Sequence, residues 1–437
     1  MKAGRILLAL LLVIGSLGVL INGAAMYTRF LYLGVLLAAA SWMWTRWAAF
    51  GLRVTRKART QRANVGDVFE EKFEVANNSR VIVPWIEIIN QSRIPFAAGS
   101  RLFTYVKGRE KQTYLARTWL TRRGGFPLGP TRISTGDPFG FFSAGKEIAP
   151  IQTLVVFPVI FEIKSFLFPP GLLPGGQVIR RKSSDITPHA AGVREYVHGD
   201  AMKRIHWPTS ARRNRLMVKE FEQDPQAEIW LYLDSQKEVH YSKPHQVEEI
   251  PVEAMMLKKR PKFKLPPSTL EYSISITASL AHYFIGQRRA VGYVSAGQTF
   301  NVLSAEHSER QEAKILETLA FVEANSSLSI AALVTVQASQ LPQGSSVILV
   351  TPTVRPDLIH AVDDLQRRFL RPVVVLLDAE TFGGMRGTDK LIISLRERRV
   401  PVVIIQCDAD LTQALSIIPT TINTKDMSPW QAPVLSH

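Results

Sequence analysis

Three short apolar runs in the last third of the chain decide its fold: "SSVILVT" at residues 345–351, "RPVVVLLDA" at 371–379 and "VPVVIIQ" at 400–406. Amphipathic, helix-like segments separate them. Apolar strands that alternate with helices are typical of a parallel sheet covered on both faces. Upstream runs continue the same alternation. We therefore predict a C-terminal α/β domain with a parallel sheet over residues 227–425.

The first half of the chain has a different pattern. "VFEEKFEVANN" at residues 68–78 alternates polar and apolar residues, as a half-buried strand does. Similar short runs follow without a convincing amphipathic helix, so we predict an antiparallel β-sandwich-like domain over residues 60–165. Within it, "DPFG" at 137–140 predicts a turn with an aromatic plug. The alternative is a phosphate-binding loop, but the spacing of the glycines does not fit one. Residues 166–226 are predicted to connect the two domains.

Residues 1–55 predict a membrane anchor of two helices. The 21 residues 6–26 carry no charge and are long enough to cross a bilayer, and a second apolar run follows at 30–44. Basic residues are concentrated after the second run, so the positive-inside rule places the soluble domains in the cytoplasm. The alternative, a cleaved signal peptide, is disfavoured by the length of the first run and by the presence of the second. We expect a cell-membrane protein with two spans.

The positive charge lies in the front half of the chain. The net charge is +16, and residues 101–220 hold 20 Lys and Arg against 8 Asp and Glu. Such a field favours anionic lipid or an acidic partner as well as nucleic acid. The single cysteine, Cys407, excludes an internal disulfide framework and suits a reducing compartment.

The most distinctive polar stretch is "GDAMKRIHWPTSAR" at residues 199–212. In a catalytic centre, His206 would be a general base oriented by Asp200, with Arg204 or Arg212 holding an anion. No serine or cysteine nucleophile stands in a matching context. In an architectural and docking element, Trp207 would be a buried anchor, and Asp200 would pair with Arg204 or Arg212. We favour the docking hypothesis.

Nucleic-acid binding is a third hypothesis for the same region. The basic residues from Arg212 to Lys219, together with Trp207, could combine phosphate contacts with base stacking. The sequence contains no recognised nucleic-acid fold, and a membrane tether argues against this role. We therefore expect no nucleic-acid partner.

Residues 193–222, "VREYVHGDAMKRIHWPTSARRNRLMVKEFE", resemble the signature of the bacterial family called domain of unknown function 58. The resemblance implies a von Willebrand factor A-like C-terminal domain. It also implies frequent gene neighbourhood with MoxR-type AAA+ ATPases, and sometimes with transglutaminase-like membrane proteins, but no established activity. The matching residues are Arg194, Tyr196, Gly199, Asp200, Arg204, Ile205, Trp207, Ser210, Ala211, Arg212, Leu216, Val218, Lys219 and Glu220.

The resemblance also raises the question of a metal. Von Willebrand A domains that bind one use D-x-S-x-S after the first strand, because carboxylate and hydroxyl oxygens suit Mg²⁺. Here Asp234 is followed by Gln236 and Glu238 in place of the two serines. We therefore expect no cofactor, with Mg²⁺ at this degenerate site as the alternative and capping of the next helix by Asp234 as the simpler role.

Together these observations predict a cytoplasm-facing scaffold without enzymatic activity. It would work with a MoxR-type ATPase in the assembly or maturation of envelope or protein complexes. The alternative is a hydrolytic or transfer enzyme that uses the region of Asp200 and His206.

Overall fold

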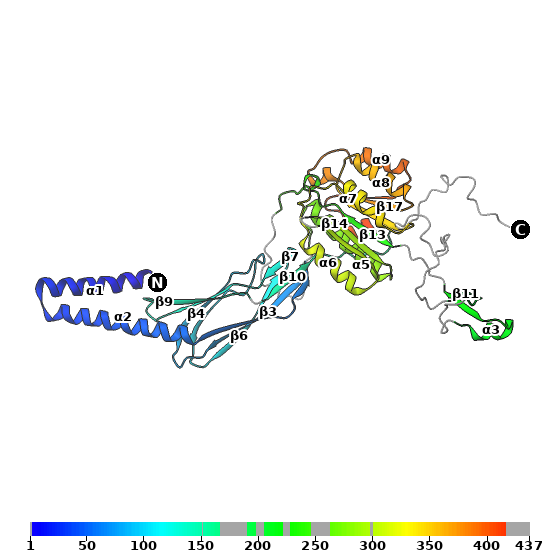
Figure 1. Cartoon of the computed structure of the whole chain (residues 1–437). Coiled ribbons are helices and arrows are strands. Elements are labelled where there is room, and N and C mark those ends of the chain that lie inside the picture. The colour runs from blue at the N-terminus through cyan, green and yellow to red at the C-terminus, as the bar shows by residue number, and fades with distance from the viewer. Residues whose placement is uncertain are drawn as a thin grey trace. The chain divides into compact units, whose positions relative to one another are not determined.

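A computed structural model describes residues 2–150, 152–166, 190–197, 205–221, 228–245, 263–297 and 300–416 (Figure 1). The chain divides into two compact units. Unit 1 comprises Met1–Val159 with two later segments, Pro244–Pro266 and Leu316–Val322, and unit 2 comprises the remainder.

Unit 1 begins with two antiparallel helices, α1 (Lys2–Asn22) and α2 (Ala25–Gly51), which lie side by side in Figure 1. The segment Gly4–Ile21 of α1 is the one described stretch that is long and apolar enough to cross a membrane. In α2 the uncharged run between Arg29 and Arg46 has 16 residues, or about 24 Å of helix. One apolar helix is therefore found where the sequence predicted two spans.

Ten strands follow in unit 1, and they form three sheets. The first sheet has the order β1-β3-β6, the second β5-β4-β8-β9 and the third β2-β10-β7. Their bounds are β1 Leu52–Ala58, β2 Arg62–Asn64, β3 Val68–Asn77, β4 Val83–Asn90, β5 Arg101–Val106, β6 Lys111–Trp119, β7 Gly124–Pro127, β8 Thr131–Gly136, β9 Ser143–Ile148 and β10 Thr153–Phe157.

The first two sheets share one apolar core. Phe73 of β3, Ile86 of β4 and Ile133 of β8 belong to the same buried cluster, which also includes Ala48 from the last turns of α2. Alternating strands with one buried face build such a core between two sheets. The predicted antiparallel pairing holds for these sheets, but β10 pairs with β2 in parallel.

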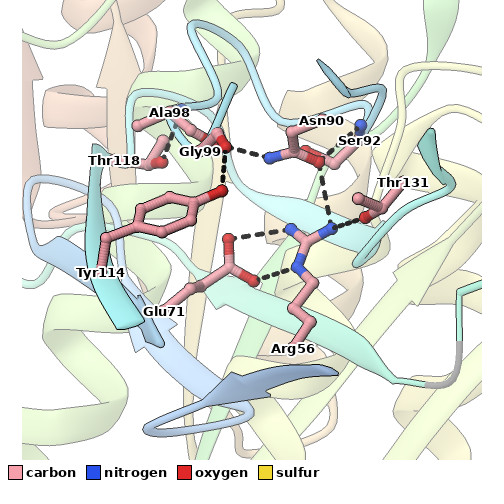
Figure 2. A network of polar contacts seen from close by, with 9 residues as sticks. All are labelled: Arg56, Glu71, Asn90, Ser92, Ala98, Gly99, Tyr114, Thr118 and Thr131. Carbon is pink, nitrogen blue, oxygen red and sulfur yellow. Dashed lines mark hydrogen bonds and ion pairs between the residues drawn. The ribbon is translucent and has the colours of Figure 1, made fainter. Parts of the chain in front are cut away.

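A largely buried arginine forms an ion pair within the first sheet and a hydrogen bond to the second. Arg56 of β1 donates from Nε and Nη2 to the two carboxylate oxygens of Glu71 on β3, at 2.6 and 2.8 Å, and from Nη1 to Asn90 Oδ1 on β4, at 3.0 Å (Figure 2). The Glu71 side chain is 1% exposed and that of Arg56 is 11% exposed. Bidentate, charge-assisted bonds of this kind fix geometry as well as supplying energy. The guanidinium therefore sets how the two sheets meet.

Unit 2 contains a six-stranded sheet of order β15-β14-β13-β16-β17-β18. All neighbours are parallel except β15, which runs antiparallel to β14. The parallel sheet expected from the sequence is thus found in five strands, and the edge strand β15 makes the sheet mixed. Only three residues separate β14 from β15, and a parallel neighbour requires a crossover of a dozen or more. The strands are β13 Ile229–Leu233, β14 Val291–Ala296, β15 Phe300–Glu306, β16 Ser346–Thr351, β17 Arg371–Leu377 and β18 Val402–Ile405.

Helices cover this sheet. Residues of α7, α8 and α9 share a buried cluster with Tyr232, Leu349 and Val374, which line one face, and α5 packs against β13 and β16. The helices that follow β13 are α5 Thr269–Gly286, α6 Glu309–Phe321, α7 Ile330–Gln337, α8 Asp357–Arg367, α9 Thr388–Glu397 and α10 Leu411–Leu415, with single turns η2 Lys237–Val239, η3 Ala338–Gln340 and η4 Ala379–Phe382. The part of α6 from Leu316 onward belongs to unit 1.

Candidate functional site

The signature stretch forms a small module of its own. Strands β11 (Ala190–Glu195) and β12 (Met217–Phe221) pair antiparallel, and the short helix α3 (Trp207–Arg213) lies between them in sequence. Residue Ile205 forms a bridge to Val218, so the chain entering α3 also runs beside β12. The last part of the signature, Met217–Phe221, is therefore a strand.

His206 begins the helix. Its Nδ1 lies 2.7 Å from Thr209 Oγ1 and accepts a longer hydrogen bond from the Thr209 backbone N–H, at 3.3 Å. An N-cap acceptor of this kind satisfies one of the free N–H groups at a helix start. Since Nδ1 is engaged in the cap, the ring is oriented by its own helix. In the described residues, no carboxylate is seen to orient it as a general base.

Ser210 fastens the helix to the strand. Its hydroxyl accepts from Met217 N at 2.8 Å and donates to His206 O at 3.0 Å, and the side chain is 8% exposed. A buried hydroxyl with both roles filled is a structural group, because breaking either bond would leave a polar atom unsatisfied. Ile205, Met217 and Val218 are buried beside it.

Trp207 corrects a prediction made from the sequence. It was expected to be a buried anchor, but its side chain is 65% exposed. Two strands and a seven-residue helix offer too little apolar surface to cover an indole. On the other side of the module, the Tyr196 backbone N–H donates to the Leu216 carbonyl at 2.8 Å, so Leu216 lies opposite Tyr196, the neighbour of Val197.

Apolar and basic side chains of the module are exposed. Leu216 is 44% exposed and Val197 is 62% exposed. Arg212 and Arg213 are exposed in the last turn of α3, and Arg215 forms an exposed ion pair with Glu195 at 2.7 Å. We call this the Trp207 patch: Val197, Trp207, Arg212, Arg213 and Leu216.

Several candidate residues cannot be placed in this geometry. Gly199, Asp200 and Arg204 lie outside the described residues, and so does the predicted pairing of Asp200 with an arginine. For Arg194, Lys219 and Glu220 only the backbone positions on β11 and β12 are described. Tyr196 is half-buried.

The second candidate site is the end of β13. The Asp234 carboxylate accepts a hydrogen bond from Thr351 Oγ1 at 2.6 Å through Oδ2 and from Gln236 N at 3.0 Å through Oδ1. Burial raises the pKa of Asp234 to about 6, although both hydrogen bonds oppose the rise. Asp234 thus holds the backbone just before η2 and also ties β13 to the end of the neighbouring strand β16.

The other positions of the degenerate metal motif are already occupied. Glu238 forms an ion pair with Arg355 at 2.6 Å, and Gln236 is 5% exposed. Across the described ranges, no group of three or more His, Cys, Asp or Glu side chains could hold a metal ion. The local chemistry fits a closed hydrogen-bonded strand end better than the open oxygen cage that Mg²⁺ requires.

Sequence reasoning missed two partners of Asp234. His240 Nε2 lies 2.9 Å from the Asp234 carbonyl oxygen, its Nδ1 lies 3.0 Å from Thr269 Oγ1, and burial lowers the pKa of His240 to about 4. Thr351 could have been found, because it ends the run "SSVILVT" and parallel strands end at the same edge of a sheet. Nothing in the spacing pointed to His240.

The comparisons agree with the signature. The family model described as "Protein of unknown function DUF58" matches residues 192–257. This segment of the chain, which contains the signature stretch, is therefore similar to the DUF58 family. A DUF58-like relative, the uncharacterised protein YeaD of Bacillus subtilis, is 26% identical over 230 residues, which are 51% of this chain and 49% of YeaD. The chain thus matches about half the length of that relative.

Solved structures add no functional information. The CARDB domain of a Pyrococcus furiosus protein is 14% identical over 24% of this chain and 91% of that domain, with a TM-score of 0.17. An exo-β-N-acetylglucosaminidase from Vibrio harveyi is 7% identical over 79% of this chain and 59% of its own, with a TM-score of 0.18. Neither similarity bears on the function of this chain.

Proposed function

We propose that this chain is a membrane-anchored scaffold without enzymatic activity. It would face the cytoplasm and dock a MoxR-type AAA+ ATPase, or a client of that ATPase, in the assembly or maturation of envelope or protein complexes. A transglutaminase-like membrane protein is a second partner of the same kind. The proposal includes a von Willebrand A-like identity for the sheet of unit 2 and a second membrane span in α2.

The Trp207 patch is the observation that carries the docking role. Tryptophan and arginine are the residues that most often dominate binding energy at protein interfaces. In the signature module the polar atoms of His206 and Ser210 support the backbone, whereas Trp207, Arg212 and Arg213 face solvent. A short helix that exposes an indole in its first turn and two cations in its last turn suits recognition of an acidic protein surface with an apolar pocket.

The helix α1 supports the anchor. Its segment Gly4–Ile21 is only 11% buried, so most of its apolar surface faces outward from the protein. Outward-facing apolar side chains over 18 residues are stable in lipid and costly in water. The single cysteine, Cys407, gives a direct test of orientation. A membrane-impermeant thiol reagent should label it only after cells are permeabilised, and labelling of intact cells would place unit 2 outside.

Binding of the ATPase is tested with the full-length protein in detergent and a purified MoxR-type ATPase from the same organism. Trp207→Ala should weaken binding at least about 30-fold, which corresponds to about 2 kcal/mol for a hot-spot residue. The double variant Arg212→Glu, Arg213→Glu should also bind the ATPase more weakly, and its binding should weaken further as salt is lowered. The new carboxylates repel an acidic partner surface, and low salt screens that repulsion less.

Phe369→Ala is the matched control. Phe369 is 71% exposed on unit 2 and lies outside the signature module, so this variant should bind like the wild type. Undiminished binding by a folded Trp207→Ala variant would exclude the patch as the docking site. If the wild type itself does not bind, the ATPase is not the partner.

A further inference from the structure

The turn between β8 and β9 holds an aromatic ring out in solvent. The Asp137 carboxylate, 1% exposed, accepts hydrogen bonds from the backbone N–H groups of Phe139, Phe141 and Phe142 at 2.9, 3.2 and 2.6 Å. Phe141 is buried, while Phe139 is 59% exposed with its ring stacked on that of Phe141 at 5.5 Å. The sequence-based prediction of a turn with an aromatic plug is confirmed, but the outer ring is left uncovered.

This turn lies against the first turn of α1. Arg5 donates from Nε to the Phe141 carbonyl at 3.1 Å and from Nη2 to Ser143 Oγ at 3.3 Å. A Cβ at Gly4 would come within 2.8 Å of the Phe139 carbonyl oxygen, so the close approach requires glycine. Phe139 is therefore next to the residue at which the apolar segment Gly4–Ile21 begins.

The second helix reaches the same level with aromatic side chains. α1 and α2 are in close contact where Gly15 meets Leu31. At a rise of 1.5 Å per residue, Arg5 lies about 26 Å along α1 from the turn that connects the two helices. On α2, Trp42 lies at about the same distance from that turn. Trp42 is 57% exposed. About 26 Å is close to the thickness of a hydrocarbon core, and aromatic rings and arginines concentrate at its edges.

The helices and the turn belong to one packed unit. The last turns of α2 pack on β8 and β9, the strands that the turn connects, and Ala48 of α2 lies in the sandwich core. The level of Phe139 relative to the helices is thus set by packing within unit 1.

We propose that the turn Asp137–Phe142 is a second membrane-contact element, in which Phe139 inserts its ring into the interfacial layer of the lipid bilayer. The inference rests on the proposed anchoring by α1. Asp137 fixes the conformation of the turn. The Arg5 side chain, while bonded to the turn, lies at the level of the lipid phosphates. The exposed Phe139 ring is then buried among headgroups and upper acyl chains, where its apolar surface is removed from water. The turn would seat the β-sandwich against the membrane.

The test uses single-cysteine variants of the full-length protein in a Cys407→Ser background, labelled with the environment-sensitive fluorophore NBD. The protein is reconstituted in vesicles of phosphatidylcholine and phosphatidylglycerol at 3:1 that carry a nitroxide quencher on the headgroup or deep in the acyl chain. Phe139→Cys reports the turn, and Val13→Cys, in the middle of α1 and 54% exposed, reports the anchor. Thr60→Cys is the aqueous control, because it is exposed beyond the far end of β1.

We expect the Phe139 probe to emit at shorter wavelength than the Thr60 probe, with at least a twofold stronger quenching from the headgroup nitroxide. The Val13 probe should be quenched by the deep nitroxide. If Val13 is quenched while Phe139 behaves like Thr60, the turn does not touch the bilayer and the inference is wrong. If Val13 is not quenched, the proposed anchoring by α1 is wrong.

Discussion

Two buried titratable groups in unit 2 act in opposite directions on its stability. Burial raises the pKa of Asp234 from 3.8 to about 6, and burial lowers the pKa of His240 from 6.5 to about 4. The two are in contact, since His240 Nε2 lies 2.9 Å from the Asp234 carbonyl oxygen. The pH dependence of stability in this window therefore depends on the presence of both.

The sign of each effect follows from which state binds more protons. Between pH 4 and 6 folded Asp234 keeps a proton that the unfolded chain releases, so its contribution to the free energy of unfolding falls as pH rises. Between pH 4 and 6.5 unfolded His240 holds a proton that the folded chain excludes, so its contribution rises with pH. At 1.36 kcal/mol per pKa unit, each effect is on the order of 3 kcal/mol. The two nearly cancel in the wild type.

Single substitutions should reveal each effect. In Asp234→Asn only the effect of His240 remains. From pH 4 to 6.5 the free energy of unfolding of unit 2 should therefore rise by roughly 3 kcal/mol more than it does in the wild type. In His240→Gln, which retains a side-chain donor for the Asp234 carbonyl, unit 2 should lose a similar amount from pH 4 to 6. For a unit of this size, 3 kcal/mol corresponds to a change of about 6–12 °C in Tm.

The measurement is differential scanning calorimetry of the full-length protein in a neutral detergent from pH 4 to 7. The transition of unit 2 is identified with Leu349→Ala, because Leu349 is fully buried in that unit and its truncation should lower only that Tm. Taking each variant relative to the wild type removes the titration of all other groups. Equal slopes of Tm against pH in the three proteins would refute the opposed pKa shifts.

Three further outcomes follow from buried polar contacts. Arg56→Met removes the partner of the buried Glu71 carboxylate, so it should lower the free energy of unfolding of unit 1 by about 3–5 kcal/mol. Arg59→Met breaks an exposed ion pair and should lower it by less than about 1 kcal/mol. Similar calorimetric shifts for both variants would contradict the buried geometry. Asp137→Ala removes the acceptor for three backbone N–H groups and should cost at least about 3 kcal/mol in the same transition; an unchanged Tm would show that the turn forms without it. Ser210→Ala should speed hydrogen exchange of the backbone amide bonded to its hydroxyl about tenfold, and no change would mean that the bond contributes nothing.

Much of the fold could be predicted from local pattern. The uncharged run 6–26 predicts the apolar helix, because a span needs only length and hydropathy. The strand–helix alternation after residue 227 predicts the sheet of unit 2, since periodicity reports which side of an element is covered. "DPFG" predicts its turn, because an aspartate can bond the backbone N–H groups that follow it. Each of these is a property of neighbours in sequence.

The parts that could not be predicted depend on residues far apart in the chain. The antiparallel edge strand β15, the partners His240 and Thr351 around Asp234, and the crosslink by Arg56 all depend on which elements come together. Trp207 shows the same limit most directly: its neighbours in sequence are those of a buried anchor, yet it is exposed. Burial is set by the area that distant segments bring to a side chain, and the sequence around that side chain does not contain this quantity.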